Sequence, residues 1–116
     1  MAPTIADGQR IRVTEANEFS RLDIVVYRPP TEDAWFVGRV IGLPGETMEV
    51  VEGTLLLGGE VWSDVVAVNH HYDLLSVTVP EGAFFILGDN RSDSYDSHVF
   101  GPVSASSIVG IVEVLP

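Results

Sequence analysis

Short apolar or alternating runs, separated by turn residues, recur along the whole chain. Each run has about four to nine residues, which is the length of a strand rather than of a helix. Strands are therefore expected at 9–13, 24–27, 35–43, 47–51, 54–57, 65–68, 74–79, 84–87 and 108–114. Many short strands at close spacing predict an all-β protein whose antiparallel sheets form a sandwich or a partly closed barrel. Only short helices are expected, at 15–19 or 104–108.

Glycine and proline mark the turns between these runs. At Glu52-Gly53, two turn residues separate the runs 49–51 and 54–57 and predict a β-hairpin. The second run is apolar without interruption, which predicts burial on both of its faces.

The stretch from Val61 to Asp73 interrupts this rhythm and is expected to be an insertion loop. It contains His70 and His71, two of the three histidines in the chain. Adjacent strand residues point to opposite faces of a sheet, so this pair favours a surface loop over a metal site. No metal and no cofactor is expected.

The length of 116 residues and the apolar content of 46% predict one domain, 1–116, that folds alone. The net charge of −11 argues against a nucleic-acid partner, because phosphate neutralisation needs clustered Lys and Arg. There is no cysteine, which excludes disulfides and zinc–thiolate sites. No run approaches the roughly 20 apolar residues that span a bilayer, so a soluble domain is expected. A membrane anchor before Met1 in a longer parent protein stays open.

All six basic residues are Arg, and the chain contains no Lys. Replacement of Lys by Arg has little effect on the charge of the surface. It does affect catalysis, because Arg stays protonated whereas a desolvated Lys can act as a base.

The segment from Gly88 to Pro102 is polar and lies between two apolar runs. It combines carboxylates, an Arg, a His and three Ser hydroxyls in a loop that neighbouring strands hold in place. Loops on a rigid scaffold often carry function. The alternative is a solvated hairpin loop whose Asp and Ser side chains cap their own backbone.

Four segments share their pattern with one family. They read Met1-Ala2-Pro3-Thr4-Ile5, then DIVVYRPP at 23–30, RVIGLPGE at 39–46, and GDNRSDSYDS at 88–97. In this order they resemble four sequence boxes of the type I signal peptidases, and together they extend over most of the chain. The resemblance implies the all-β fold of a serine endopeptidase that removes signal peptides from secreted preproteins. It also implies a location at the extracytoplasmic face of the membrane.

In that family, a Ser nucleophile is activated by a Lys that burial keeps neutral. By resemblance, the nucleophile position falls immediately before Met1, outside this chain, and Gly38 occupies the Lys position. The Ser–Lys dyad is therefore expected to be absent, and the missing Lys side chain is expected to leave a void. Gly38 has a simpler interpretation as a strand glycine that allows close backbone approach.

The resemblance also implies roles for the residues around the missing dyad. Asp89 is expected to pair with Arg39, and Ser94 to point at the place of the missing ammonium group. His98 stands where the family usually has Arg, and is expected to pair with Asp96 when protonated. Both Asp residues are expected to hold the fold rather than to catalyse. A substitute pair of Ser94 and His98 is the less favoured alternative.

Substrate recognition in the family uses strand addition. The equivalent strand here is Trp35-Phe36-Val37, with Pro3 and Ile5 on the facing edge. The expected partner is an extended peptide or a segment of an exported protein. Trp35 and Phe36 also suit an apolar rim against a lipid surface, although core packing is the more usual position of such aromatic residues.

The leading hypothesis is a catalytically inactive homologue of signal peptidase I that acts as a peptide-binding or assembly factor for exported proteins. The first alternative is a soluble fragment or variant of an active signal peptidase I. The second is a structural β module whose surface mediates oligomerisation.

Overall fold

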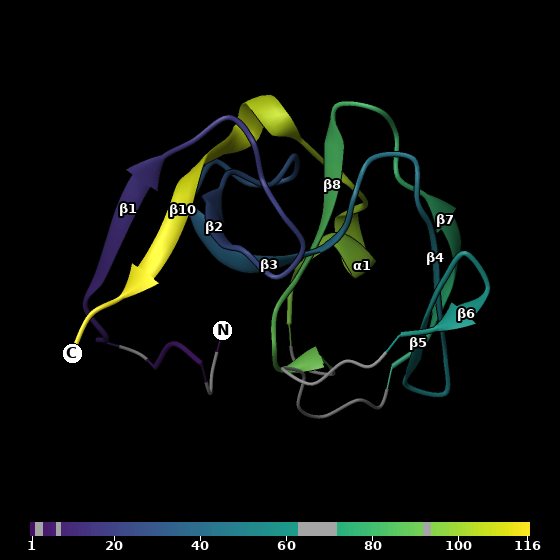
Figure 1. Ribbon diagram of the computed structural model, residues 1–116. Coiled ribbons are helices and arrows are strands. Elements are labelled where there is room, and N and C mark those ends of the chain that lie inside the picture. The colour runs from purple at the N-terminus through teal and green to yellow at the C-terminus, as the bar shows by residue number, and fades with distance from the viewer. Residues whose placement is uncertain (2–3, 7, 63–71, 92–93) are drawn as a thin grey trace.

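The computed structural model of the protein describes residues 1, 4–6, 8–62, 72–91 and 94–116. These residues form two antiparallel sheets (Figure 1). The first sheet has the order β1-β10-β2-β3-β8-β9, with β1 (Ile11–Glu15), β2 (Ile24–Tyr27), β3 (Phe36–Gly42), β8 (Ala83–Leu87), β9 (Val103–Ser104) and β10 (Ile108–Val114). The second has the order β6-β5-β4-β7, with β4 (Thr47–Val51), β5 (Thr54–Leu57), β6 (Glu60–Val61) and β7 (Leu74–Thr78). The predicted all-β antiparallel fold is confirmed, and within the described residues neither sheet closes into a barrel.

Most of the predicted strands are present within one or two residues of their expected ends. The predicted helix at 15–19 is wrong, because Glu15 is the last residue of β1 and the chain after it is irregular. A 3-10 turn, Ala105–Ser107, lies inside the second predicted helical segment. The run 65–68, with His70, His71 and most of the proposed insertion loop, falls outside the described residues.

The predicted hairpin is formed by β4 and β5, with Val51 paired to Thr54. Glu52 and Gly53 have φ values of 49° and 81°, the left-handed conformations of a type I′ turn. Burial of β5 on both faces is wrong: Leu55 is buried, but the residues around it are half-buried or exposed. The reason is that β5 lies in a small outer sheet with only one face against the core.

β3 and β8 lie at the centre of the molecule, between the outer strands of the first sheet and the second sheet (Figure 1). Their successive side chains point to opposite faces and so contribute to two apolar clusters. The cluster toward the second sheet contains Ile41, Met48, Val50, Leu55, Val79, Ala83, Phe85 and Leu87. The other contains Val25, Tyr27, Val40, Phe84, Ile86, Val103 and Ile108. This double packing fixes the positions of both central strands.

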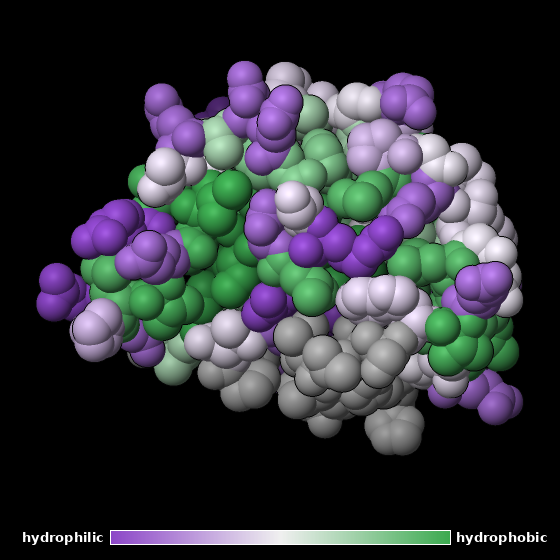
Figure 2. Space-filling model, viewed as in Figure 1, coloured by the Kyte–Doolittle hydropathy of each residue, from purple (hydrophilic) through white to green (hydrophobic). Residues whose placement is uncertain are grey.

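β3 is longer than the part of it that β8 covers. The ladder between them ends where Arg39 pairs with Leu87, whereas β2 pairs with β3 as far as Phe36. Beyond this point the chain leaves β8 and forms the polar segment that begins at Gly88, including the four-residue helix α1 (Ser97–Phe100). Figure 2, viewed from the same side as Figure 1, shows a band of hydrophilic side chains across the middle of the molecule, with apolar side chains on both sides of the band. The described residues include no helix that is long and apolar enough to cross a membrane.

Candidate functional site

A buried ion pair joins β3 to the polar segment. The Asp89 side chain is fully buried and accepts hydrogen bonds from Arg39 Nε and Nη2, both at 3.0 Å. Arg39 Nη1 also donates to the carbonyl of Leu22, a non-glycine residue held at a φ of 79°. A bidentate pair of this kind gives geometric definition as well as energy. The ion pair expected between Arg39 and Asp89 is therefore present.

The N-terminal segment lies against the same carboxylate. The Thr4 hydroxyl donates a short hydrogen bond to Asp89 Oδ2. Ile5, half-buried, donates its backbone N–H to the carbonyl of Met1 at 3.2 Å. Asp89 thus binds the first and the third of the segments identified in the sequence. The role of Thr4 was missed by sequence reasoning, although Thr4 belongs to the first segment.

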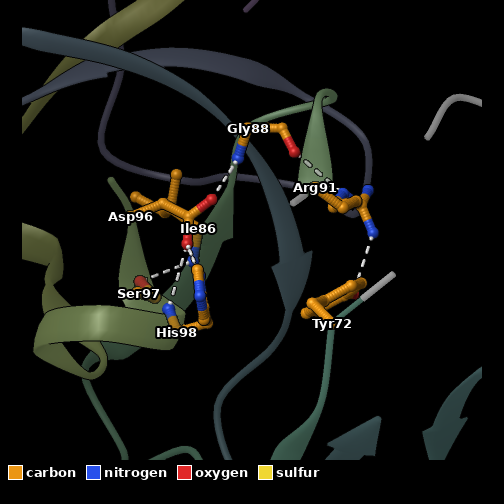
Figure 3. A network of polar contacts seen from close by, with 7 residues as sticks. All are labelled: Tyr72, Ile86, Gly88, Arg91, Asp96, Ser97 and His98. Atoms are coloured by element: carbon orange, nitrogen blue, oxygen red, sulfur yellow. Dashed lines mark hydrogen bonds and ion pairs between the residues drawn. The ribbon is translucent and has the colours of Figure 1, made fainter. Parts of the chain in front are cut away.

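Asp96 organises the end of the polar segment (Figure 3). It caps α1 by accepting from the backbone N–H of His98, while its other oxygen accepts from the N–H of Gly88 at 2.7 Å. His98 Nδ1 lies 2.8 Å from the same carboxylate. The expected contact between Asp96 and His98 is present, and both polar groups act here as structural partners. Among the described residues, no hydrogen bond joins His98 to Ser94, so the substitute pair is not assembled.

Arg91 was missed by sequence reasoning as a structural residue. It is almost fully buried, and its Nε donates to the carbonyl of Gly88 at 2.8 Å (Figure 3). Its Nη1 lies 3.3 Å from the hydroxyl of Tyr72, whose ring packs edge-on against His98. Through these contacts Arg91 connects the polar segment to Tyr72, which lies two residues before β7 of the second sheet.

The surroundings of Gly38, the position that the resemblance assigns to the family's Lys, are apolar and filled. A Cβ atom at Gly38 would lie 2.4 Å from Ile86 Cγ2 and 3.2 Å from Tyr27 Cε1. Both distances are shorter than an ordinary van der Waals contact. The void expected beside Gly38 is therefore absent, because two side chains of the surrounding apolar cluster occupy that space. The interpretation of Gly38 as a residue of close approach fits this geometry.

Tyr27 is a second residue that the sequence reasoning missed. It is 1% exposed and packs between Phe36 and Phe100 in the aromatic cluster next to Gly38. Burial, followed by the negative charge of Asp96, raises the pKa of the Tyr27 hydroxyl. Tyr27 therefore stays protonated and supplies no base beside Gly38.

The Ser94 hydroxyl lies over Gly88, and its orientation toward the place of an ammonium group stays a prediction. A Cβ at Gly88 would lie 2.1 Å from Ser94 Oγ, so only glycine fits under this hydroxyl. The three atoms nearest to a Cβ at Gly38 belong to Ile86, Tyr27 and Leu87.

The residues expected to bind a peptide have different environments. Trp35 is 57% exposed, with the Arg28 guanidinium stacked 4.3 Å from its ring, so it is not a core residue. Phe36 is half-buried and packs edge-on against Tyr95, and Val37 is also half-buried. Pro3 lies outside the described residues.

The backbone of β3 offers an open edge at these residues. Val40 uses both its N–H and its C=O toward the β2 side, with Asp23 and Leu22. Because these groups alternate along a strand, the N–H and C=O of Val37 point to the opposite side. On that side, within the described residues, the β8 ladder has already ended at Arg39. The site is thus a short unpaired strand edge beside a buried ion pair.

Comparison with known proteins identifies a family for this chain. The sequence matches the family described as signal peptidase, peptidase S26, over residues 1–115. Signal peptidase I of Leptolyngbya laminosa is 36% identical over 123 residues, which cover 95% of this chain and 61% of that protein. Signal peptidase I V of Bacillus subtilis is 35% identical over 134 residues, with 97% of this chain and 77% of that protein covered.

A solved structure gives the same result. The crystal structure of a signal peptidase I from Enterococcus faecalis matches with a TM-score of 0.67 and 34% identity, covering 81% of this chain and 96% of that one. The chain spans only 61% and 63% of the lengths of its relatives from Leptolyngbya laminosa and Synechocystis. Since the family match includes nearly every residue and the fold agrees with it, this chain belongs to the signal peptidase family, peptidase S26.

Proposed function

We propose that this chain is a signal-peptidase-like domain that binds extended segments of exported proteins and lacks Ser–Lys chemistry of its own. The observation that carries the proposal is the environment of Gly38. Around it, Arg39 is paired to Asp89 and the edge at Val37 is open within the described residues, while Ile86 and Tyr27 fill the space where a side chain at residue 38 would begin.

Binding follows from the backbone of β3. An extended peptide that lies beside Val37 accepts a hydrogen bond from the Val37 N–H and donates one to the Val37 C=O, as in other strand additions. Side chains of Phe36 and Trp35 flank this position and offer apolar contact area to alternate residues of the peptide.

The absence of catalysis follows from the choice of residues. A Ser nucleophile needs a nearby group that accepts its proton at neutral pH. The chain contains no Lys, and Arg stays protonated. The Asp89 and Asp96 carboxylates already accept hydrogen bonds from Arg39, Thr4, Gly88 and His98. Loss of a positioned base alone lowers a rate by about 10²–10⁴-fold.

The binding half of the proposal is tested by titrating the isotope-labelled chain with an extended peptide whose alternate residues are Ala. We expect amide chemical-shift changes concentrated at Trp35 to Arg39. Val37→Pro, which removes the N–H at the open edge, is expected to weaken binding at least tenfold. The matched ligand control is the same peptide carrying backbone N-methyl groups. Shifts that are absent, or equal for both peptides, would contradict binding by strand addition and favour a structural β module.

The catalytic half is tested with a Ser placed before Met1 and a signal-peptide substrate. We expect no cleavage when residue 38 is Gly and slow cleavage with Gly38→Lys. The double variant Gly38→Lys/Ile86→Ala is expected to cleave faster than Gly38→Lys alone, because Ala at position 86 makes room for the Lys side chain. If the Ser-bearing chain with Gly38 cleaves as fast as the Bacillus subtilis relative, the chain is a variant of an active signal peptidase and the proposal is wrong.

The proposal also places the domain at the extracytoplasmic face of a membrane, with Trp35 as a lipid contact. Its exposed ring supports this, since an amphipathic indole suits a membrane interface. Co-sedimentation with neutral phosphatidylcholine vesicles measures the contact. Trp35→Ala is expected to lower the bound fraction, whereas Val13→Ala on β1 serves as a control of similar exposure and is expected to leave it unchanged.

A further inference from the structure

The second sheet carries charge of one sign only. From residue 43 to residue 81 the chain contains seven acidic residues and no Lys or Arg. They are Glu46, Glu49, Glu52, Glu60, Asp64, Asp73 and Glu81. All six Arg residues lie in the parts of the sequence that build the first sheet and its loops. Arg21 pairs with Glu46, and the other six acidic residues leave the second sheet with a field that attracts cations and repels a second copy of itself.

The two sheets also differ in how their edge strands are protected. β1, an edge of the first sheet, carries Arg12 and Glu15 among its five residues, and Arg12 forms an ion pair with Glu113 of β10. β7, an edge of the second sheet, consists of Leu74, Leu75, Ser76, Val77 and Thr78 and has no charged residue. Charged residues on an edge strand oppose association with other chains. β7 lacks this protection.

Leu75 is the most prominent apolar residue of this edge. Its side chain is 91% exposed, and the register between β4 and β7 shifts at this point, between the pairs Met48–Val77 and Val50–Leu74. An irregular register of this kind turns a side chain away from the sheet. A surface hollow of about 330 Å³ adjoins Leu75 and is also lined by Val51, Glu49 and Asp73. Within the described residues neither acidic group forms a salt bridge.

From these observations we infer that the β7 edge is a docking surface for a basic, partly apolar segment of another protein. An apolar side chain of the partner contacts Leu75 and Val51, and a Lys or Arg of the partner lies between Glu49 and Asp73. The aliphatic part of such a long side chain covers apolar surface while its charged end reaches the carboxylates.

A second copy of the chain does not fit this surface. A symmetric contact through β7 brings Glu49 and Asp73 of both copies together, and like charges at close range oppose association. The β7 edge belongs to the second sheet, whereas the open edge at Val37 belongs to the first. The inference is therefore independent of the function proposed for β3.

The test uses the whole chain and an eight-residue capped peptide of alternating Lys and Val, measured by fluorescence anisotropy. Leu75→Lys is expected to weaken binding at least tenfold, while Val13→Lys, which adds the same charge to the edge strand β1, changes it less than twofold. Asp73→Asn keeps an acceptor for the Glu52 N–H and is expected to weaken binding about threefold and to reduce its dependence on salt.

Three results would overturn the inference. One is equal binding of a Glu–Val peptide of the same length. Another is equal weakening by Leu75→Lys and Val13→Lys, which means a diffuse electrostatic attraction. The third is self-association that Leu75→Lys abolishes, which assigns the edge to a second copy. Amide shifts separate this site from the proposed one, because binding at β7 moves Leu74 to Thr78 and binding at β3 moves Trp35 to Arg39.

Discussion

Two neighbouring residues of β3 face opposite surroundings. Arg39 points into polar surroundings. Its Nε and Nη2 donate to the Asp89 carboxylate, and its Nη1 donates to the Leu22 carbonyl. Gly38 faces an apolar cluster in which Ile86 and Tyr27 lie where a Cβ at this residue would be. One side of the strand therefore carries the charged pair that the resemblance predicts, whereas on the other side a Cβ at residue 38 would be too close to Ile86.

The difference shows that a site's frame and its reactive group have separate physical requirements. The ion pair stabilises the fold by joining β3 to the polar segment, so it is retained whether or not a reaction takes place. A buried Lys costs free energy unless it is compensated, whereas packed apolar atoms in the same space stabilise the fold. Apolar packing against Gly38 is thus compatible with a stable domain.

The largest effect is expected from the polar side. Asp89→Ala leaves the guanidinium of Arg39 buried without its partner, which is expected to lower the free energy of unfolding by about 3–5 kcal/mol. Urea unfolding measures it. The matched control is Glu113→Ala, which breaks the exposed pair with Arg12 and is expected to cost less than about 1 kcal/mol. Similar losses in both variants would mean that burial does not distinguish the two pairs.

The next effect is expected from the apolar side. Gly38→Ala places a Cβ against Ile86 and is expected to cost about 1–3 kcal/mol of unfolding free energy. Ile86→Ala alone is also destabilising, because it empties a buried position. In the double variant the two costs are expected to be less than additive by about 0.5–3 kcal/mol. Full additivity, measured by the same urea titrations, would show that the two residues are not in contact.

A smaller effect concerns the hydroxyl of Tyr27 on the apolar side. Its pKa is raised in the folded state, whereas an unfolded Tyr ionises near pH 10. Above about pH 10 the unfolded chain loses this proton first, so stability falls by up to ~1.4 kcal/mol per pH unit. Tyr27→Phe is expected to reduce this loss of stability above pH 10, which urea unfolding at several pH values measures. If the wild type and Tyr27→Phe lose the same unfolding free energy above pH 10, the burial of the Tyr27 hydroxyl is contradicted.

The smallest effect belongs to a second ion pair of the polar side. Arg21 donates to both oxygens of Glu46 and to the carbonyl of Ile41 on β3, and this hydrogen bonding lowers the pKa of Glu46. The stabilisation is present above the unfolded pKa of about 4.3 and is lost as the pH falls through the lower folded value. Glu46→Gln is expected to remove this acid-induced loss, which is about 1 kcal/mol. Thermal unfolding between pH 3 and pH 6 measures it, and an unchanged profile in the variant would exclude the pair as its source.

The sequence predicted the strands well because their signal is local. Alternation and turn residues fixed β2, β4, β5 and β10 at the ends that the structure shows. The helix α1 was missed because four residues are too few for a helical period, and because its cap, Asp96, looks like any other carboxylate of a polar loop.

The resemblance to the family predicted which charged residues of the site pair with each other. It did not predict which apolar side chains pack around Gly38. The pairs Arg39–Asp89 and Asp96–His98 came from the resemblance. The filled space beside Gly38 depends on side chains from β2 and β8, which are distant in sequence, so the expected void could not be corrected without the structure. Tyr27 and Arg91 were missed for the same reason, since burial cannot be read from one position.

The place of β10 between β1 and β2 affects the order of events during synthesis. Neither β1 nor β2 is complete as a sheet strand until residues 108–114 have left the ribosome, because both pair with β10. At about 5–20 residues per second, β1 waits roughly 5–20 s for β10, the strand with which it pairs within the described residues. In the second sheet β4, β5 and β6 form consecutive hairpins and β7 pairs with β4, so all four strands have their partners once residue 78 has been synthesised. A nascent chain is therefore expected to present an acidic, partly folded second sheet while its first strand is still unpaired.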